Sequence, residues 1–303
     1  MTNIGIQTIL TSSQSFARLI YRMILAQLIH RMTYQIRKRD VTCMLGLSLE
    51  GGGAKGAFHM GAIQAFLEAG YEIGGITGTS IGALNGAVIA QGDFEAGFQW
   101  WNSVNNASLF DLDQPQVQKL LNKKIDKDSL RYFSAKLKDI IGNKGLDTKN
   151  MRRMLHGIID EEKLRNSPID FGIVTVSLSE LKPLELYKED IPKGQMLDFL
   201  MASANLPVFK LEPIDGKYYI DGGFYDNCPI NLLNRKGYDH IIAIRTMGIG
   251  ITRKPRNPNM QVTYLIPSEN LGHTFNFDQK SIQHDLQLGY HDAQKLLKNH
   301  PFT

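Results

Sequence analysis

The fold is decided between Leu45 and Gly82, where the sequence reads LGLSLE-GGGAKG-AFHMGAIQAFLEAG-YEIGGIT-GTSIG. The apolar run at 44–49 predicts a buried strand, and the helical spacing of apolar residues at 57–69 predicts a helix that stops at Gly70. A second strand is predicted at 73–77, and a second helix, rich in small residues, at 81–91. Two glycine-rich turns therefore each join a strand to the helix that follows it.

The same alternation returns in the second half of the chain. Apolar runs predict strands, and longer periodic segments predict helices. The predicted strands are 171–178, 183–187, 240–245 and 261–266, and the predicted helices are 195–203 and 278–297. An Asp-Gly pair at 215–216 predicts a hairpin that joins 211–214 to 217–220. Strands that alternate with helices indicate an α/β fold with helices on both faces of the sheet.

The section between these halves has a different composition. Residues 105–165 are rich in Lys, Asp and Asn, and helical patterns recur near 115–123, 127–141 and 148–158. We interpret this section as a helical insertion within one domain that extends from residue 44 to 303. A separate core is not expected there.

The first 43 residues differ from the rest in charge. They contain six basic residues and one acidic residue, whereas the remainder has 28 basic and 29 acidic residues. Three interpretations stand: a basic helix on a membrane surface, a targeting segment, or a dispensable extension before Met44. We favour the last, because the globular pattern begins abruptly at Met44.

Composition excludes several function classes. The chain has 303 residues, of which 43% are hydrophobic and 21% are charged, as in ordinary globular proteins. A near-neutral body without a basic stripe argues against nucleic-acid binding. Cys43 and Cys228 are too few for a disulfide framework and are typical of a cytoplasmic protein with reduced thiols. No metal-binding motif is present, so we expect neither a metal nor another cofactor.

The turn at 78–82 matches G-x-S-x-G, a pattern that exposes a serine at a sharp strand-to-helix turn. Ser80 is therefore the candidate nucleophile, and the following helix directs its N-terminus at the reaction centre. The turn at 51–56 matches G-x-G-x-x-G, which also occurs in dinucleotide-binding proteins. A dinucleotide-binding site also needs an acidic residue at the end of the second strand, and the available candidate, Glu72, precedes that predicted strand. The alternative is an oxyanion site made by glycine N–H groups.

A base for Ser80 is harder to find from the residues alone. Asp221 follows a predicted strand, where catalytic side chains collect in α/β folds, although an ordinary Asp-Gly turn explains it equally well. A Ser-Asp-His triad requires a histidine after Asp221, and His273 is the one in a plausible loop. In α/β-hydrolases the nucleophile normally follows several strands, whereas here one predicted strand–helix pair precedes the strand that leads to Ser80.

Taken together, these motifs resemble the patatin-like phospholipases, a family of lipid acyl hydrolases. The resemblance covers roughly residues 44–245 and rests on four segments in order: GGGAKG at 51–56, GTSIG at 78–82, ASANLP with Phe209 at 202–209, and DGG at 221–223. It implies a three-layer α/β/α sandwich with a mostly parallel central sheet. It also implies a Ser80–Asp221 dyad without histidine, which acts through an acyl-enzyme.

The resemblance assigns further roles around this dyad. The implied oxyanion hole consists of Gly51, Gly52, Gly53 and Ile81. Supporting residues are Lys55, Gly56, Gly78, Gly82, Gly222, Gly223 and Asn227. The implied substrate is a phospholipid or other acylglycerol, so we expect transient contact of a cytoplasmic protein with a membrane surface. Phe98, Trp100 and Trp101 follow the serine turn, and either an acyl groove or ordinary core packing explains them.

Overall fold

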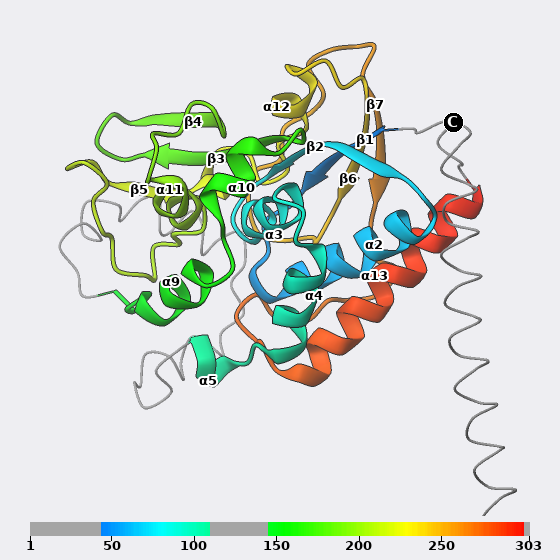
Figure 1. Cartoon of the computed structure of the whole chain (residues 1–303), viewed down its shortest axis with the longest axis horizontal. Coiled ribbons are helices and arrows are strands. Elements are labelled where there is room, and N and C mark those ends of the chain that lie inside the picture. The colour runs from blue at the N-terminus through cyan, green and yellow to red at the C-terminus, as the bar shows by residue number, and fades with distance from the viewer. Residues whose placement is uncertain (1–43, 110–144, 300–303) are drawn as a thin grey trace, which may run out of the picture.

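A central sheet covered by helices forms the described part of the chain. The structure, a computed structural model, describes residues 44–109 and 145–299 (Figure 1). The strands are β1 (Met44–Leu49), β2 (Glu72–Gly78), β3 (Asp170–Ser177), β4 (Lys182–Tyr187), β5 (Tyr219–Asp221), β6 (His240–Ile244) and β7 (Gln261–Leu265). Their order is β4-β3-β2-β1-β6-β7, with β5 paired to β3 off this path. Only β4 and β5 run antiparallel to their neighbour, so the predicted α/β fold with a mostly parallel sheet is confirmed.

The helices follow the strands in the predicted alternation. In the described residues they are α2 (Ala57–Glu68), α3 (Ile81–Ala90), α4 (Phe94–Ser103), α5 (Asn106–Leu109), α9 (Lys149–His156), α10 (Glu161–Asn166), α11 (Met196–Ser203), α12 (Ile230–Asn234) and α13 (Gln279–Asn299). Two short 3-10 turns, η1 (Gly53–Gly56) and η2 (Gly222–Phe224), occur in the glycine-rich segments.

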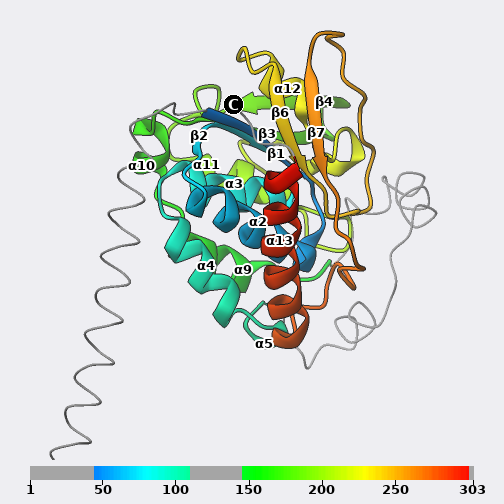
Figure 2. The same cartoon turned by 90° about the vertical axis from the view of Figure 1, so that its right-hand side faces the viewer.

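The larger core lies on the face of the sheet covered by α2, α3 and α13. Leu47, Leu49 and Ile76 point into it and are fully buried. Helices α2 and α13 lie side by side (Figure 2). They approach so closely that a Cβ atom on Gly61 would lie 1.9 Å from the Leu286 carbonyl oxygen. A glycine at this position therefore allows the last helix to close the core.

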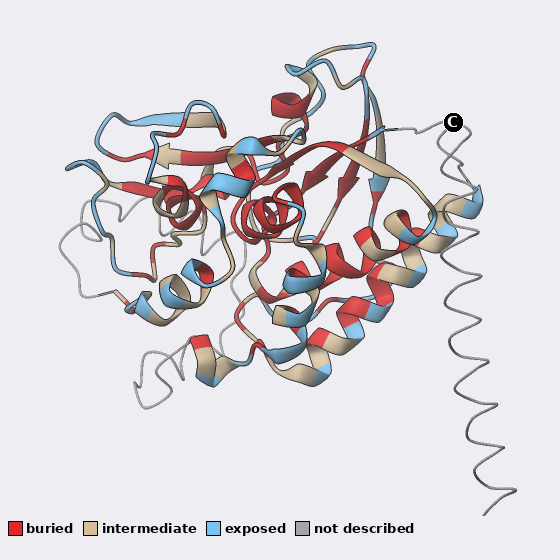
Figure 3. Ribbon diagram, viewed as in Figure 1, coloured by how far each residue is buried: buried red, intermediate tan, exposed pale blue. Residues whose placement is uncertain are grey.

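A smaller core lies on the opposite face, under α12. It contains Ile230, Leu233, Ile241 and Ala243, while the intervening residues of β6 point into the larger core. The strands present small residues here, since a Cβ atom on Gly172 would lie 3.0 Å from Leu232. Helices thus cover both faces. The inner strands β1, β2, β3 and β6 are mostly buried, whereas the outer strands β4 and β7 are partly exposed (Figure 3).

The predicted turn at Asp215-Gly216 forms, and Ile214 and Lys217 exchange two backbone hydrogen bonds across it. The predicted extension of this hairpin over 211–220 is wrong, because the strand of this region, β5, pairs with β3. The buried Thr175 hydroxyl on β3 donates to the Ile220 carbonyl oxygen at 2.8 Å, which adds to the ladder. Pairing with a buried strand removes more apolar surface from water than a short exposed hairpin would.

Parts of the predicted organisation lie outside the described residues. These are the basic segment 1–43 and the helices expected at 115–123 and 127–141. The third helix expected in the insertion, at 148–158, corresponds to α9. In the part of the chain that is described, no helix combines the length and the apolar composition needed to cross a bilayer.

Candidate active site

Ser80 lies in a sharp turn between β2 and α3. Its φ of 57° is in the positive region that residues with a side chain rarely adopt. The flanking glycines make this turn possible, because a Cβ atom on Gly82 would lie 2.2 Å from the Leu49 carbonyl oxygen, and one on Gly78 would lie 2.3 Å from Gly82. Such strain is typical of functional sites. The geometry is that of the nucleophile turn expected from G-x-S-x-G.

The backbone of Ser80 is fixed by a second serine that the sequence did not single out. Its N–H donates to Ser203 Oγ at 3.0 Å, and Ser203 in turn donates to the Val174 carbonyl oxygen at 2.7 Å. Ser203 ends α11 and is fully buried. It belongs to the ASANLP segment, which was the one sequence signal for a role at the site.

Asp221 reaches Ser80 because two strands share one edge of β3. Strand β2 pairs with β3 up to Ile173, and β5 continues along the same edge from Thr175. The end of β5 therefore lies just beyond the end of β2, where Ser80 follows. Asp221 Oδ1 accepts from the Gly223 N–H at 2.7 Å, and Asp221 lines the same pocket as Ser80.

The environment of Asp221 makes it a stronger base than an ordinary carboxylate. The residue is 3% exposed, and this burial raises its pKa to about 6, against the smaller opposing effects of the hydrogen bond from Gly223 and of the nearby Ser80 hydroxyl. A carboxylate with a pKa near 6 is ionised at neutral pH and accepts a proton more readily than one in water.

Three residues beside the serine have backbone N–H groups without a partner in the described part of the chain. Gly52, Gly53 and Ile81 line the same pocket as Ser80 and Asp221. Within residues 44–109 and 145–299, none of their N–H groups donates to another residue. Gly53 has a φ of +59°, and a Cβ atom there would lie 2.1 Å from the Thr274 carbonyl oxygen, so glycine is required.

Gly51 does not belong to this group, contrary to the expectation from the resemblance. Its N–H donates to the Asn227 carbonyl oxygen at 3.0 Å, so it is not free for an oxyanion. Its carbonyl oxygen accepts from the Thr246 hydroxyl at 2.6 Å. Gly51 therefore anchors the loop that presents the next two glycines.

Glu50, the residue before Gly51, also holds this loop in place. Sequence reasoning did not identify it. It is fully buried, and its carboxylate accepts from Arg245 at 2.9 Å and from the Thr246 and Met247 N–H groups at 2.8 and 2.9 Å. Burial of a carboxylate requires such partners. A glutamate directly after an apolar strand was the available signal, but its partners lie about 195 residues away.

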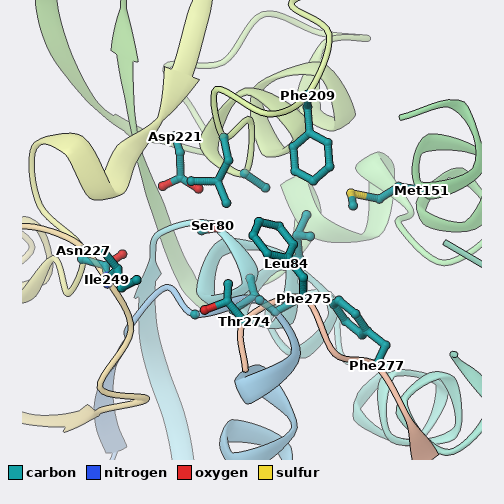
Figure 4. A pocket seen from close by; sticks show the side chains of 15 residues that line it. Ser80, Leu84, Met151, Phe209, Asp221, Asn227, Ile249, Thr274, Phe275 and Phe277 are labelled. Atoms are coloured by element: carbon teal, nitrogen blue, oxygen red, sulfur yellow. The ribbon is translucent and has the colours of Figure 1, made fainter. Parts of the chain in front are cut away.

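Ser80, Asp221 and the glycines at 52 and 53 line a pocket of about 80 Å³ that is polar at one end and apolar at the other. Figure 4 shows Asp221 and Asn227 on one side of Ser80, and Phe209, Met151 and Phe277 on the other. Its 15 lining residues are Gly52, Gly53, Ser80, Ile81, Leu84, Met151, Ala204, Leu206, Phe209, Asp221, Asn227, Ile249, Thr274, Phe275 and Phe277.

No histidine is among these lining residues. His273 is exposed, although its neighbour Thr274 lines the pocket. His59 is fully buried beside Asn85, and burial lowers its pKa to about 3, which keeps it neutral. It therefore packs under the glycine loop, away from Ser80.

The remaining predicted residues surround the site. The Lys55 ammonium donates to the Met247 carbonyl oxygen at 3.4 Å. Burial lowers its pKa, and attraction to Glu50 and Asp285 opposes that shift. Trp101 is fully buried in the core and donates to Asn85, whereas Trp100 lines a smaller apolar pocket next to Leu84.

Known proteins share this arrangement of sequence segments. An uncharacterized NTE family protein of Mycobacterium tuberculosis is 27% identical over 207 residues, which are 67% of this chain and 49% of that protein. The neuropathy target esterase sws of Drosophila melanogaster is 26% identical over 203 residues, 66% of this chain and 13% of that protein. The chain thus spans about half the length of the first of these relatives and far less of the second.

A solved structure shares the fold. VipD from Legionella pneumophila superposes with a TM-score of 0.50 at 16% identity, over 85% of this chain and 67% of VipD. The sequence model of the patatin-like phospholipases matches residues 47–234, which include both glycine-rich turns and the Asp221-Gly222-Gly223 segment. A dinucleotide-binding interpretation leaves that last segment unexplained. The chain belongs to the patatin-like phospholipase family.

Proposed function

We propose that this protein hydrolyses fatty-acyl esters of phospholipids or other glycerolipids through a Ser80–Asp221 dyad and an acyl-enzyme. The observation that carries the proposal is that one pocket joins Ser80, held in a strained turn, to the buried carboxylate of Asp221, whose pKa is raised to about 6. The family description and the esterase name of the Drosophila relative support an ester as the reacting group.

In the acylation step, Asp221 takes the proton of the Ser80 hydroxyl while the oxygen attacks the ester carbonyl carbon. The carbonyl oxygen becomes negatively charged and is stabilised by the N–H groups of Gly52, Gly53 and Ile81. Collapse of this tetrahedral intermediate breaks the bond to the alcohol, which leaves with the proton from Asp221. Ser80 then carries the fatty acyl group.

In the deacylation step, water takes the place of the departed alcohol. Asp221 removes a proton from the water, and the resulting hydroxide attacks the acyl carbon. Collapse of the second intermediate releases the fatty acid and returns the proton to Ser80. The same carboxylate thus acts in both halves of the reaction, with no histidine involved.

The apolar end of the pocket suits the acyl chain of such an ester. Met151, Phe209, Phe275 and Phe277 form a wall beside Ser80 that excludes water from the reaction centre. Acyl glycerolipids reside in membranes, so the protein must approach a lipid surface to reach them. We therefore include transient contact with a membrane surface in the proposal.

The test is a lipid hydrolysis panel whose products are identified by mass. Wild type is compared with Ser80→Ala, Asp221→Ala and, as a matched control, His273→Ala. We expect fatty acid release by wild type and His273→Ala, and loss of it in the two dyad variants. Fluorophosphonate should label wild type and not Ser80→Ala. Loss of activity in His273→Ala would instead favour a triad, and an unlabelled wild type would argue against a nucleophilic serine.

A further inference from the structure

The loop after β6 presents apolar side chains at the mouth of the candidate site. Residues 247–251 read Met-Gly-Ile-Gly-Ile. The two glycines face the protein body, because a Cβ atom on Gly248 would lie 2.0 Å from the Gly51 carbonyl oxygen, and one on Gly250 would lie 2.6 Å from Asn227. The loop therefore lies directly over the two segments that carry the oxyanion glycines and Asp221.

The three apolar residues of this loop, which we name the apolar rim, are Met247, Ile249 and Ile251. Ile249 lines the pocket and lies beside Asn227 (Figure 4). The side chains of its two companions extend outward, with Met247 57% exposed and Ile251 48% exposed. Clustered exposed apolar side chains are uncommon on soluble proteins and mark interaction sites. Here the exposed apolar surface continues the pocket lining to the outside.

The backbone under the apolar rim is fixed, so these side chains are not exposed through a loosely held loop. The Met247 N–H donates to buried Glu50 at 2.9 Å, and the Ile251 N–H donates to the Gly223 carbonyl oxygen at 2.9 Å. The Asn227 N–H donates back to the Ile251 carbonyl oxygen at 2.6 Å. A surface held in place before contact loses little conformational entropy when it binds.

Charge beside the apolar rim indicates which partner it meets. The half-buried Lys55 ammonium approaches Met247, and three cations follow Ile251. Lys254 and Arg256 are exposed, whereas Arg253 is half-buried and lies over the Tyr225 ring. Glu50 and Asp226, which accept from the Met247 and Arg253 N–H groups, are fully buried. Apolar side chains accompanied by exposed cations suit a surface with an apolar interior and anionic headgroups.

We propose that the apolar rim docks the protein on an anionic phospholipid bilayer, with Met247 and Ile251 inserted among the lipids and Ile249 leading from the lipids into the pocket. A glycerolipid then passes from the bilayer to Ser80 along apolar side chains. The biological use of this surface rests on the proposed function, whereas its membrane binding is measurable without catalysis.

Binding is tested by flotation of full-length Ser80→Ala, which cannot consume the vesicles. The vesicles contain phosphatidylcholine alone or phosphatidylcholine with phosphatidylglycerol. We expect flotation with the anionic vesicles, and an affinity lower by about tenfold or more when Met247→Ser and Ile251→Ser are added. Leu181→Ser is the matched control, since Leu181 is 82% exposed at the turn between β3 and β4. Equal binding of all three proteins would overturn the proposal.

A second variant guards against loss of folding. Ile251→Trp should bind like the parent protein, and its added fluorescence should shift to shorter wavelength with anionic vesicles and not with phosphatidylcholine alone. An unshifted emission would overturn insertion. Self-association of the parent that Met247→Ser and Ile251→Ser abolish would also overturn the proposal, in favour of a second copy of the chain as the occupant.

Activity separates this surface from the catalytic site. With Ser80 intact, the Met247→Ser, Ile251→Ser protein should cleave a soluble short-chain ester as wild type does and lose cleavage of lipid in anionic vesicles. Loss of both activities would show that these residues act in catalysis and not in docking. If wild type cleaves neither ester, the proposed function fails. Flotation of the Ser80→Ala protein still tests whether the apolar rim binds membranes.

Discussion

Gly51 and Asn227 bind each other through two hydrogen bonds. The Gly51 N–H donates to the Asn227 carbonyl oxygen at 3.0 Å, and the Asn227 side-chain amide donates to the Gly51 carbonyl oxygen at 3.2 Å. This pair joins the loop that presents Gly52 and Gly53 to the segment that follows Asp221. The position of the proposed oxyanion donors therefore depends on the segment that carries Asp221, the proposed base.

Replacement of Asn227 by alanine should reduce catalysis more than stability. The Gly51 carbonyl oxygen keeps its bond from Thr246, so the free energy of unfolding should fall by only about 1 kcal/mol. Misplacement of the oxyanion donors should lower kcat by about 10-fold to 100-fold. Asn231→Ala is the control, because the side-chain amide of Asn231, in α12, makes a similar bond to the Lys254 carbonyl oxygen. Equal loss of kcat in both variants would contradict a specific role for Asn227.

The pH dependence of ester hydrolysis should follow the ionisation of Asp221. Burial raises the pKa of this carboxyl to about 6, and only the ionised form accepts the serine proton. Below that pH the rate should fall about tenfold for each pH unit, and above it the rate should level off. The measurement is kcat/KM for a soluble ester across pH 4.5 to about 8. A profile that depends on a group with an ordinary carboxylate pKa would show that Asp221 is not the base.

The same carboxylate should cost stability at neutral pH. Because its folded pKa is about 6 and its ordinary value is 3.8, the folded state holds the proton more tightly than the unfolded state does. Its contribution to stability is therefore fully present below the ordinary value and is lost as pH rises through 6. The loss amounts to about 3 kcal/mol.

Asp221→Asn should remove this penalty together with the activity. The variant should be more stable than wild type at pH 8, and the difference should vanish toward pH 4, as measured by denaturant unfolding at both values. Asp198→Asn, a half-buried aspartate paired with Arg152 at 2.6 Å, provides a control that should be destabilised at neutral pH. If Asp221→Asn is less stable than wild type at pH 8, the ionised Asp221 carboxylate does not destabilise the folded state.

The local parts of the site could be predicted from the sequence, and the long-range parts could not. The turn around Ser80 requires glycines at 78 and 82 because the backbone meets itself there, and that requirement is visible in five consecutive residues. The pairing of β5 with β3 is not visible, because three residues carry little pattern and their partners lie about 45 residues earlier. The hairpin signal at Asp215-Gly216 was locally valid but was outweighed by this buried pairing.

The polar supports of the site were missed for the same reason. Ser203 accepts from the Ser80 N–H, 123 positions away, and Glu50 accepts from three donors about 195 positions away. Neither residue type nor spacing reports such a partner. The resemblance marked the segment that contains Ser203, which is why its neighbourhood was expected near the site while its bond to the Ser80 N–H was not.

Leu84 should limit the length of the acyl chain that the pocket accepts. It lines both the pocket at Ser80 and a smaller apolar pocket of about 20 Å³ between α3 and α4, whose other lining residues include Val88 and Trp100. Leu84→Ala should join the two spaces and shift the preference of kcat/KM toward longer chains, because each buried methylene group contributes about 0.8 kcal/mol. The free energy of unfolding should fall by about 2 to 5 kcal/mol, since a buried side chain is truncated. Val88→Ala enlarges the smaller pocket without opening it to Ser80 and should leave the chain-length profile unchanged. A series of esters of increasing chain length provides the measurement, and identical profiles for wild type and Leu84→Ala would show that the chain takes another route.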